Sequence, residues 1–134
     1  MILHSSYDKE NECTLFSGDC FNLLRTIGDE QVDLVVSSPP YCIGKSYEKP
    51  EDDIGTFIDM HKRLFPELFR VLKWGGSICW QVGYYSDSRE IVPLDFVVYD
   101  IVKNQLPDEL KKALSLKKQN RMDFRPWAKC KKEV

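Results

Sequence analysis

The sequence lacks several features that would place the protein in a special class. No apolar run approaches the roughly 18 residues that a membrane-spanning helix needs. The N-terminus lacks a basic segment followed by a long apolar core, so we expect no secretory signal and a cytoplasmic location. The five cysteines form no CxxC pair and the two histidines lie far apart in sequence, so we expect neither a disulfide framework nor a metal site.

What is present is an ordinary globular composition with an uneven distribution of charge. Hydrophobic residues make up 43% and charged residues 30% of the 134 residues, which fits one domain. The net charge is −2, but residues 1–102 carry −8 and residues 103–134 carry +6. Such a basic segment is either a contact for nucleic acid or a solvated, lysine-rich tail.

The hydrophobic pattern alternates between strands and helices. Short apolar runs predict strands over residues 13–17, 33–37 and 77–82. Apolar residues at helical spacing predict helices over residues 20–27, 56–72 and 94–105, and a basic helix over residues 108–120. This alternation is typical of an α/β fold with parallel strands, whose ligands bind beyond the carboxyl ends of the strands. The run over residues 33–37 is continuously apolar, which predicts a strand buried on both faces.

Four local signals indicate where helices begin, bend and end. Asp19 is placed to cap the first helix, and Thr56 with Asp59 resembles a capping box for the second. Pro66 falls inside the second helix and predicts a kink or a split. Gly75–Gly76 predicts the stop and turn after that helix.

Three ring-bearing residues are expected to pack in the interior or at contacts. His61 lies on the apolar face of the second helix, so we expect a core or interface residue and not a catalyst. Trp74 and Trp80 are expected to pack against neighbouring side chains.

The motif that carries chemistry is the tetrapeptide Ser38-Pro39-Pro40-Tyr41, which directly follows an apolar strand. The two prolines fix φ and remove two backbone donors, and the residue before each is held extended. The segment therefore presents carbonyl oxygens, one hydroxyl and one aromatic ring, but no strong nucleophile and no general base. This set suits gripping a planar group with N–H donors while its nitrogen attacks another reactant.

Four sequence blocks resemble the DNA amino-methyltransferase family, which methylates the exocyclic amine of adenine (N6) or cytosine (N4) with S-adenosylmethionine. The family's catalytic tetrapeptide is Asp/Asn/Ser-Pro-Pro-Tyr/Phe, and SPPY matches it at residues 38–41. The other blocks are GDCFNLL at residues 18–24, GKSYE at 44–48 and LKWGGSICW at 72–80. The resemblance covers residues 18 to about 105 and implies a partial Rossmann-like methyltransferase fold.

The resemblance implies roles for individual residues. Ser38 and the carbonyl of Pro39 would accept hydrogen bonds from the target amine, so that its nitrogen attacks the sulfonium methyl. Tyr41 would stack on the base, which must first leave the duplex. Together, Ser38, Pro39, Pro40 and Tyr41 form the predicted catalytic set.

Cofactor and DNA contacts are also implied by the resemblance. Asp19 and Cys20, with Ser38, are predicted to lie at the S-adenosylmethionine site, although helix capping alone would also explain Asp19. Lys45 and Tyr47 are predicted to contact double-stranded DNA, through phosphate and the surroundings of the flipped base; simple solvation is the alternative.

The chain departs from the family pattern at the cofactor loop. Family members carry a glycine-rich loop, typically Asp-Pro-Phe-x-Gly-Ser-Gly, and this sequence has none. The resemblance therefore implies an N-terminal catalytic portion, with a second chain that carries the loop as a candidate partner. We predict a polar lead-in over residues 1–12, the catalytic portion over 13–105 and a basic tail over 106–134.

Three functions remain open on the sequence. The first is a site-specific DNA methyltransferase of restriction–modification type, as a fragment or a subunit. The second is a non-catalytic remnant or a module that binds DNA or a partner through the basic tail. The third is amine methylation of RNA or of a protein glutamine, which Ser38 disfavours because related tetrapeptides more often begin with Asn. Within the DNA family, Ser38 favours cytosine N4 over adenine N6.

Overall fold

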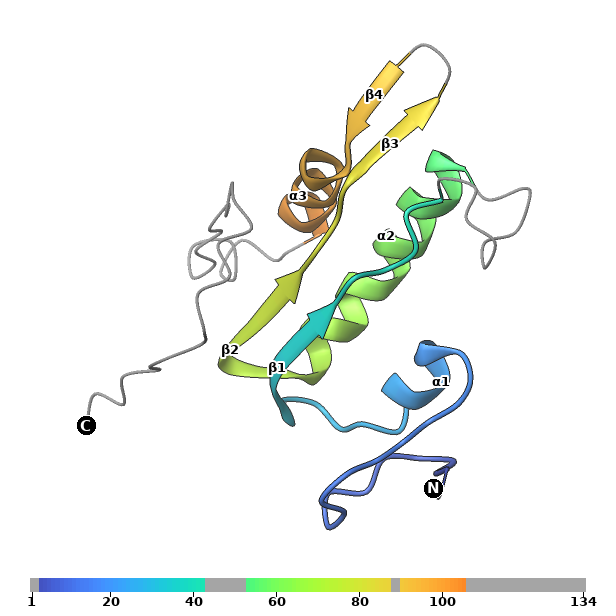
Figure 1. The fold of residues 1–134 in the computed structure, drawn as a ribbon. Coiled ribbons are helices and arrows are strands. Elements are labelled where there is room, and N and C mark those ends of the chain that lie inside the picture. Colours follow the sequence, from blue (N-terminus) through green and yellow to red (C-terminus); the bar gives the residue numbers. More distant parts are fainter. Residues whose placement is uncertain (1–2, 43–52, 88–89, 106–134) are drawn as a thin grey trace, which may run out of the picture.

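The computed structural model describes residues 3–42, 53–87 and 90–105. The elements in chain order are α1 (Cys20–Leu24), β1 (Val32–Ser37), α2 (Ile54–Val71), β2 (Leu72–Trp80), β3 (Tyr84–Asp87), β4 (Glu90–Pro93) and α3 (Leu94–Gln105) (Figure 1). β1 and β2 pair in parallel and are joined through α2, while β3 and β4 form an antiparallel hairpin. The predicted α/β class with parallel strands is confirmed.

Helix α2 begins earlier than the sequence pattern indicated. The side chain of Asp53 accepts hydrogen bonds from the Thr56 N–H at 2.8 Å and from the Thr56 hydroxyl at 3.2 Å. The predicted capping box of Thr56 and Asp59 is therefore wrong, because Asp53 already satisfies a free N–H of the first turn.

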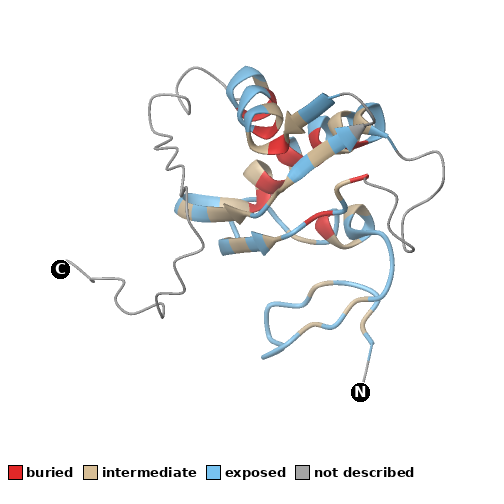
Figure 2. Cartoon of the chain, turned by 45° about the horizontal axis from the view of Figure 1, so that its top comes forward, coloured by how far each residue is buried: buried red, intermediate tan, exposed pale blue. Residues whose placement is uncertain are grey.

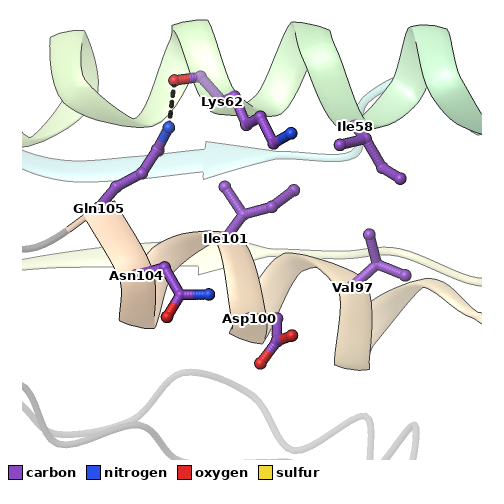
Figure 3. Close-up of a pocket in the computed structure, with 7 residues that line it drawn as sticks. All are labelled: Ile58, Lys62, Val97, Asp100, Ile101, Asn104 and Gln105. Atoms are coloured by element: carbon purple, nitrogen blue, oxygen red, sulfur yellow. Dashed lines mark hydrogen bonds between the residues drawn. The ribbon is translucent and has the colours of Figure 1, made fainter.

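Pro66 does not split α2, which runs without a break to Val71. A proline at this position leaves the carbonyl of Lys62, four residues earlier, without its helical partner. The Nε2 amide of Gln105 on α3 donates to that carbonyl at 2.7 Å (Figure 3). The Gln105 side chain of α3 thus replaces the helical N–H donor that Pro66 cannot supply to the Lys62 carbonyl.

Helix α2 covers one face of the β1–β2 pair. Trp80 on β2 lies on that face, where its ring centroid is 5.3 Å from that of Phe65 and its indole N–H donates to His61. The opposite face carries Leu34 and Val36, which are 49% and 68% exposed. The expectation that this strand is buried on both faces is therefore wrong for the part of the chain that the structure describes, since α2 covers a single face.

The two adjacent glycines lie inside β2 and do not end the helix. Val32 pairs with Leu72 and Leu34 with Ser77, so β2 uses three more residues than β1 over this stretch. Gly75 has a φ of 81°, which favours glycine. The predicted helix stop is wrong, because the glycines accommodate an irregularity of the kind seen in β-bulges.

The buried residues gather where α2 and α3 meet each other and the sheet (Figure 2). On the two helices they are Phe57, His61, Leu64, Phe65, Leu68 and Val71 of α2, and Leu94, Val98, Ile101 and Val102 of α3. His61 is fully buried, which confirms the prediction of a core residue. Trp80 packs as expected, whereas Trp74 is 73% exposed in the irregular part of β2, so its predicted packing is wrong.

The N-terminal segment differs most from expectation. The run predicted as a strand over residues 13–17 is irregular and exposed or half-buried, with one backbone hydrogen bond from the His4 N–H to Leu15 O at 2.7 Å. A strand needs a neighbour to pair with, and none of the described strands lies beside it. Helix α1 is also shorter than predicted, ending at Leu24. No helix among the described residues is long and apolar enough to cross a membrane.

Candidate active site

The tetrapeptide leaves the carboxyl end of β1. Ser37 pairs with Trp80 across the sheet, and the N–H of Gln81 donates to Ser37 O at 2.9 Å. The chain after β1 and the chain after β2 therefore emerge side by side. This is the position that the topology rule for parallel sheets assigns to a ligand site.

Hydrogen bonds fix the side chains of the tetrapeptide against the exit of β2. The hydroxyl oxygens of Ser38 and Tyr41 are 3.0 Å apart, and the Tyr41 hydroxyl donates to Gln81 O at 3.4 Å. Pro39 is buried, Tyr41 is half-buried, and Ser38 and Pro40 are exposed. The structure thus brings together the hydroxyl and the aromatic ring of the predicted catalytic set.

The Tyr41 ring packs against Gly83, where the absence of a side chain leaves space for it. A Cβ atom at Gly83 would lie 3.2 Å from Cε2 of Tyr41, closer than most such contacts in proteins. The Leu94 N–H holds the Gly83 carbonyl at 3.1 Å, which ties this position to the first turn of α3. Sequence reasoning missed Gly83, because its role depends on a contact with a residue 42 positions away.

Cys42 turns the chain directly after the tetrapeptide. It is buried and has a φ of 55°, in the left-handed region that costs a non-glycine residue about 1–2 kcal/mol. Strained residues of this kind persist where the surrounding structure holds them, and they cluster at functional sites.

The predicted cofactor residues lie at the start of α1. The Asp19 carboxylate accepts from the Phe21 N–H at 2.9 Å, so the predicted helix cap is confirmed. Partial burial and the neighbouring Asp19 charge raise the pKa of the Cys20 thiol, so the thiol stays protonated near neutral pH. Neither residue supplies a nucleophile to the site.

Arg70 fastens α1 to the end of α2. Its guanidinium donates to Leu24 O at 2.9 Å and to Ile27 O at 2.9 Å, which are backbone groups at and beyond the end of α1. It also pairs with Asp29 at 2.8 Å and Glu67 at 2.9 Å, and these hydrogen bonds raise its pKa further. No local pattern indicates this role, beyond a basic residue in the last helical turn.

The predicted DNA-contacting residues lie outside the part of the chain that the structure describes. Lys45, Tyr47 and residues 106–134, including the predicted basic helix, lie outside the described residues. Asp19 and Cys20 are placed on α1, and no hydrogen bond shown among the described residues joins them to the tetrapeptide. Over the same described ranges, no group of three or more His, Cys, Asp or Glu is arranged to hold a metal ion.

A groove of about 370 Å³ lies elsewhere, between α2 and α3 (Figure 3). Its lining consists of Ile58, Lys62, Val97, Asp100, Ile101, Asn104 and Gln105. None of the tetrapeptide residues borders it, so it is separate from the candidate active site.

The Asp19 carboxylate offers acceptor oxygens of the kind that the hydroxyl and ammonium groups of a nucleoside cofactor need. The cap uses Oδ1 of the carboxylate and leaves Oδ2 outside that hydrogen bond. An exposed carboxylate oxygen at the start of a short helix can accept from ribose hydroxyls or an ammonium group. The sequence holds no Gly-x-Gly loop that would complete such a site.

Comparisons with known proteins identify the family of the chain. A family model described as DNA methylase (N6/N4 methyltransferase) matches residues 32–133. The chain is 38% identical over 101 residues to the type II methyltransferase M.BglII of Bacillus subtilis, covering 75% of this chain and 28% of that protein. It is 30% identical over 105 residues to M.MjaVI of Methanocaldococcus jannaschii, covering 77% of this chain and 52% of the relative.

A third relative is named for methylation of DNA adenine. The chain is 37% identical over 84 residues to the DNA adenine methyltransferase YhdJ of Escherichia coli, covering 60% of this chain and 26% of YhdJ. The chain thus matches about a quarter to a half of the length of these relatives. With most of its residues matched by the family model, the chain belongs to the DNA methylase family of N6/N4 methyltransferases.

Proposed function

We propose that the chain is the catalytic portion of a restriction–modification DNA methyltransferase that modifies an exocyclic base amine. The observation that carries the proposal is the rigid Ser38–Tyr41 segment at the carboxyl end of β1, with its acceptors and its ring held together. The relatives named type II methyltransferases, and one named for DNA adenine, support DNA as the substrate.

The chemistry follows from the residues of this segment. A base that has left the duplex stacks on Tyr41, and its amine donates to Ser38 Oγ and to the Pro39 carbonyl. These acceptors localise the nitrogen lone pair, which the ring otherwise delocalises. S-adenosylmethionine, when bound, would supply an electrophilic methyl group and leave as the thioether, and the methylated amine would lose one proton to solvent. Positioning and electrostatics carry the catalysis, without a covalent enzyme intermediate.

The cofactor is held jointly in this proposal. Asp19 and the Cys20 backbone, with Ser38, supply one edge of the site, which the open oxygen of the Asp19 carboxylate supports. A glycine-rich loop from outside these 134 residues supplies the rest, either on a second chain or on a longer form of this one. Ser38 favours cytosine N4 as the target, while the relative named for adenine supports N6.

DNA binding in this proposal involves charge outside the acidic part of the chain. Lys45 and Tyr47 contact the DNA near the flipped base, and residues 103–134, with a charge of +6, contact phosphates. Such a DNA-modifying enzyme works in the cytoplasm, beside the chromosome.

The test is reconstitution with labelled cofactor. The chain is combined with the unmatched part of M.BglII, which supplies the missing length, and incubated with unmethylated DNA and methyl-labelled S-adenosylmethionine. We expect label in DNA, and nucleoside analysis then separates N4-methylcytosine from N6-methyladenine. The Ser38→Ala, Tyr41→Ala double variant serves as the matched negative control. Absence of label in any DNA with the intact chain would refute the proposal.

A binding module without turnover is the second candidate, which the charge split between residues 1–102 and 103–134 favours. It predicts DNA affinity that falls steeply with salt and disappears on deletion of residues 106–134. Binding unchanged by that deletion would exclude the tail as the source.

A further inference from the structure

A serine at the first position of the tetrapeptide raises a chemical question. The family pattern also allows aspartate there, and an ionised carboxylate can only accept hydrogen bonds. A serine hydroxyl can donate or accept, and donation to the target nitrogen would occupy the lone pair that must attack the methyl group. Something must therefore set the direction of the Ser38 hydroxyl.

The neighbours of Ser38 set that direction. Tyr41 Oη is 3.0 Å from Ser38 Oγ and 3.4 Å from the backbone carbonyl oxygen of Gln81. The Tyr41 hydroxyl has one proton, and the carbonyl can only accept. Both contacts are hydrogen bonds only if Tyr41 donates to Gln81 and Ser38 donates to Tyr41. In the reverse arrangement, two acceptor oxygens would face each other at Gln81.

The positions of all three groups are tied to the fold. The Gln81 N–H bonds Ser37 O at 2.9 Å, which anchors the acceptor carbonyl beside the end of β1. The Tyr41 ring lies against Gly83, where a Cβ would come within 3.2 Å of it. The Gly83 carbonyl is in turn held by the N–H of the fully buried Leu94. The hydroxyl pair is thus part of the rigid junction of β1, β2 and α3.

We propose that Tyr41 and the Gln81 carbonyl are positioning groups that make Ser38 a hydrogen-bond acceptor. The chain of donors runs from the Ser38 hydroxyl to the Tyr41 hydroxyl to the Gln81 carbonyl. It leaves a lone pair of Ser38 Oγ for one N–H of the target amine, while the other N–H donates to the Pro39 carbonyl. The inference rests on the proposed function for its substrate, but the direction of the relay is a property of the chain alone.

The first test therefore needs no substrate. The full chain is prepared with a ¹³C label at the Gln81 carbonyl, and its resonance is compared between the wild type and Tyr41→Phe. We expect an upfield shift in the variant, because the carbonyl loses its donor while the ring stays. Tyr84→Phe, which removes an exposed hydroxyl nearby, is the matched control and leaves the resonance in place. A Gln81 resonance that does not move in Tyr41→Phe overturns the relay.

The second test is a kinetic double-mutant cycle in the reconstituted enzyme. Tyr41→Phe keeps the stacking ring, so we expect kcat to fall about threefold to tenfold while KM for DNA is unchanged. In a Ser38→Asp background the same substitution should change kcat less than about twofold, because an acceptor-only carboxylate needs no orientation. Equal losses in both backgrounds would show that Tyr41 acts without Ser38 and would overturn the relay.

The two tests also separate the two proposals. Failure of the wild-type pair to methylate DNA counts against the proposed function, and the carbonyl resonance still decides the relay. An active wild type with an unmoved resonance refutes the relay and leaves the function standing.

Discussion

His61 makes the stability of the core sensitive to mild acid. The ring is fully buried, its Nδ1 lies 2.7 Å from Phe57 O, and the Trp80 indole N–H donates to its Nε2 at 3.1 Å. A carbonyl can only accept and an indole can only donate, so the ring must be neutral with its proton on Nδ1. Protonation would place a second N–H against the indole, and burial lowers the pKa of His61 below 6.5.

The sign and size of the effect follow from linkage. Because the folded-state pKa is lowered, the neutral ring contributes its full stability above pH 6.5. That stability is lost as pH falls from 6.5 toward the folded-state pKa, at up to about 1.4 kcal/mol for each pH unit. Stability is lost because His61 binds a proton in the unfolded chain over this pH range, whereas in the folded chain it stays neutral.

Urea unfolding followed by tryptophan fluorescence measures this loss at pH 7.5, 6.5 and 5.5. We expect the unfolding free energy of the wild type to fall across this range and that of His61→Gln to stay nearly constant. His4→Gln is the matched control, since His4 is the other histidine of the chain, and it should behave as the wild type. An unfolding free energy that falls equally in the wild type and in His61→Gln would refute the assignment.

Three further predictions concern backbone groups held by side chains. Asp53→Ala removes the cap of α2 and should lower the unfolding free energy, with Asp53→Asn close to wild type. The hydrogen bonds from Thr56 lower the pKa of Asp53, so this cap acts above pH 3.8 and is lost in stronger acid. Gln105→Leu removes the side-chain donor to the exposed Lys62 carbonyl and should cost about 0.5–1.5 kcal/mol in urea unfolding, whereas Lys103→Leu should cost little. Arg70→Lys keeps the charge but loses the fork, so the amides of α1 should exchange with solvent faster; unchanged exchange would contradict the clamp.

The parts of the fold set by local pattern were predictable from sequence. The apolar run of β1, the bounds of α3 and the Asp19 cap depend on residues within a few positions of one another. The tetrapeptide was placed correctly at the carboxyl end of a parallel strand, because strand–helix alternation leaves few arrangements of such a sheet.

The parts set by distant contacts were not predictable. The irregularity at Gly75–Gly76 exists because β2 must match the register of β1, which a single segment does not encode. The β3–β4 hairpin was missed as well, although two short apolar runs around a polar turn were a signal for it. The Arg70 clamp joins groups up to 46 positions apart and left no local trace.

The proline in α2 has a consequence for how the domain opens. Because Gln105, 43 positions later, donates to the Lys62 carbonyl, that carbonyl has a partner within the protein only when the last turn of α3 is docked. The middle of α2 and the end of α3 should therefore unfold as one cooperative unit, with amides of similar protection on both helices. Pro66 would weaken α2 as an isolated helix. In this chain, the hydrogen bond that compensates for it couples the folding of α2 to that of α3.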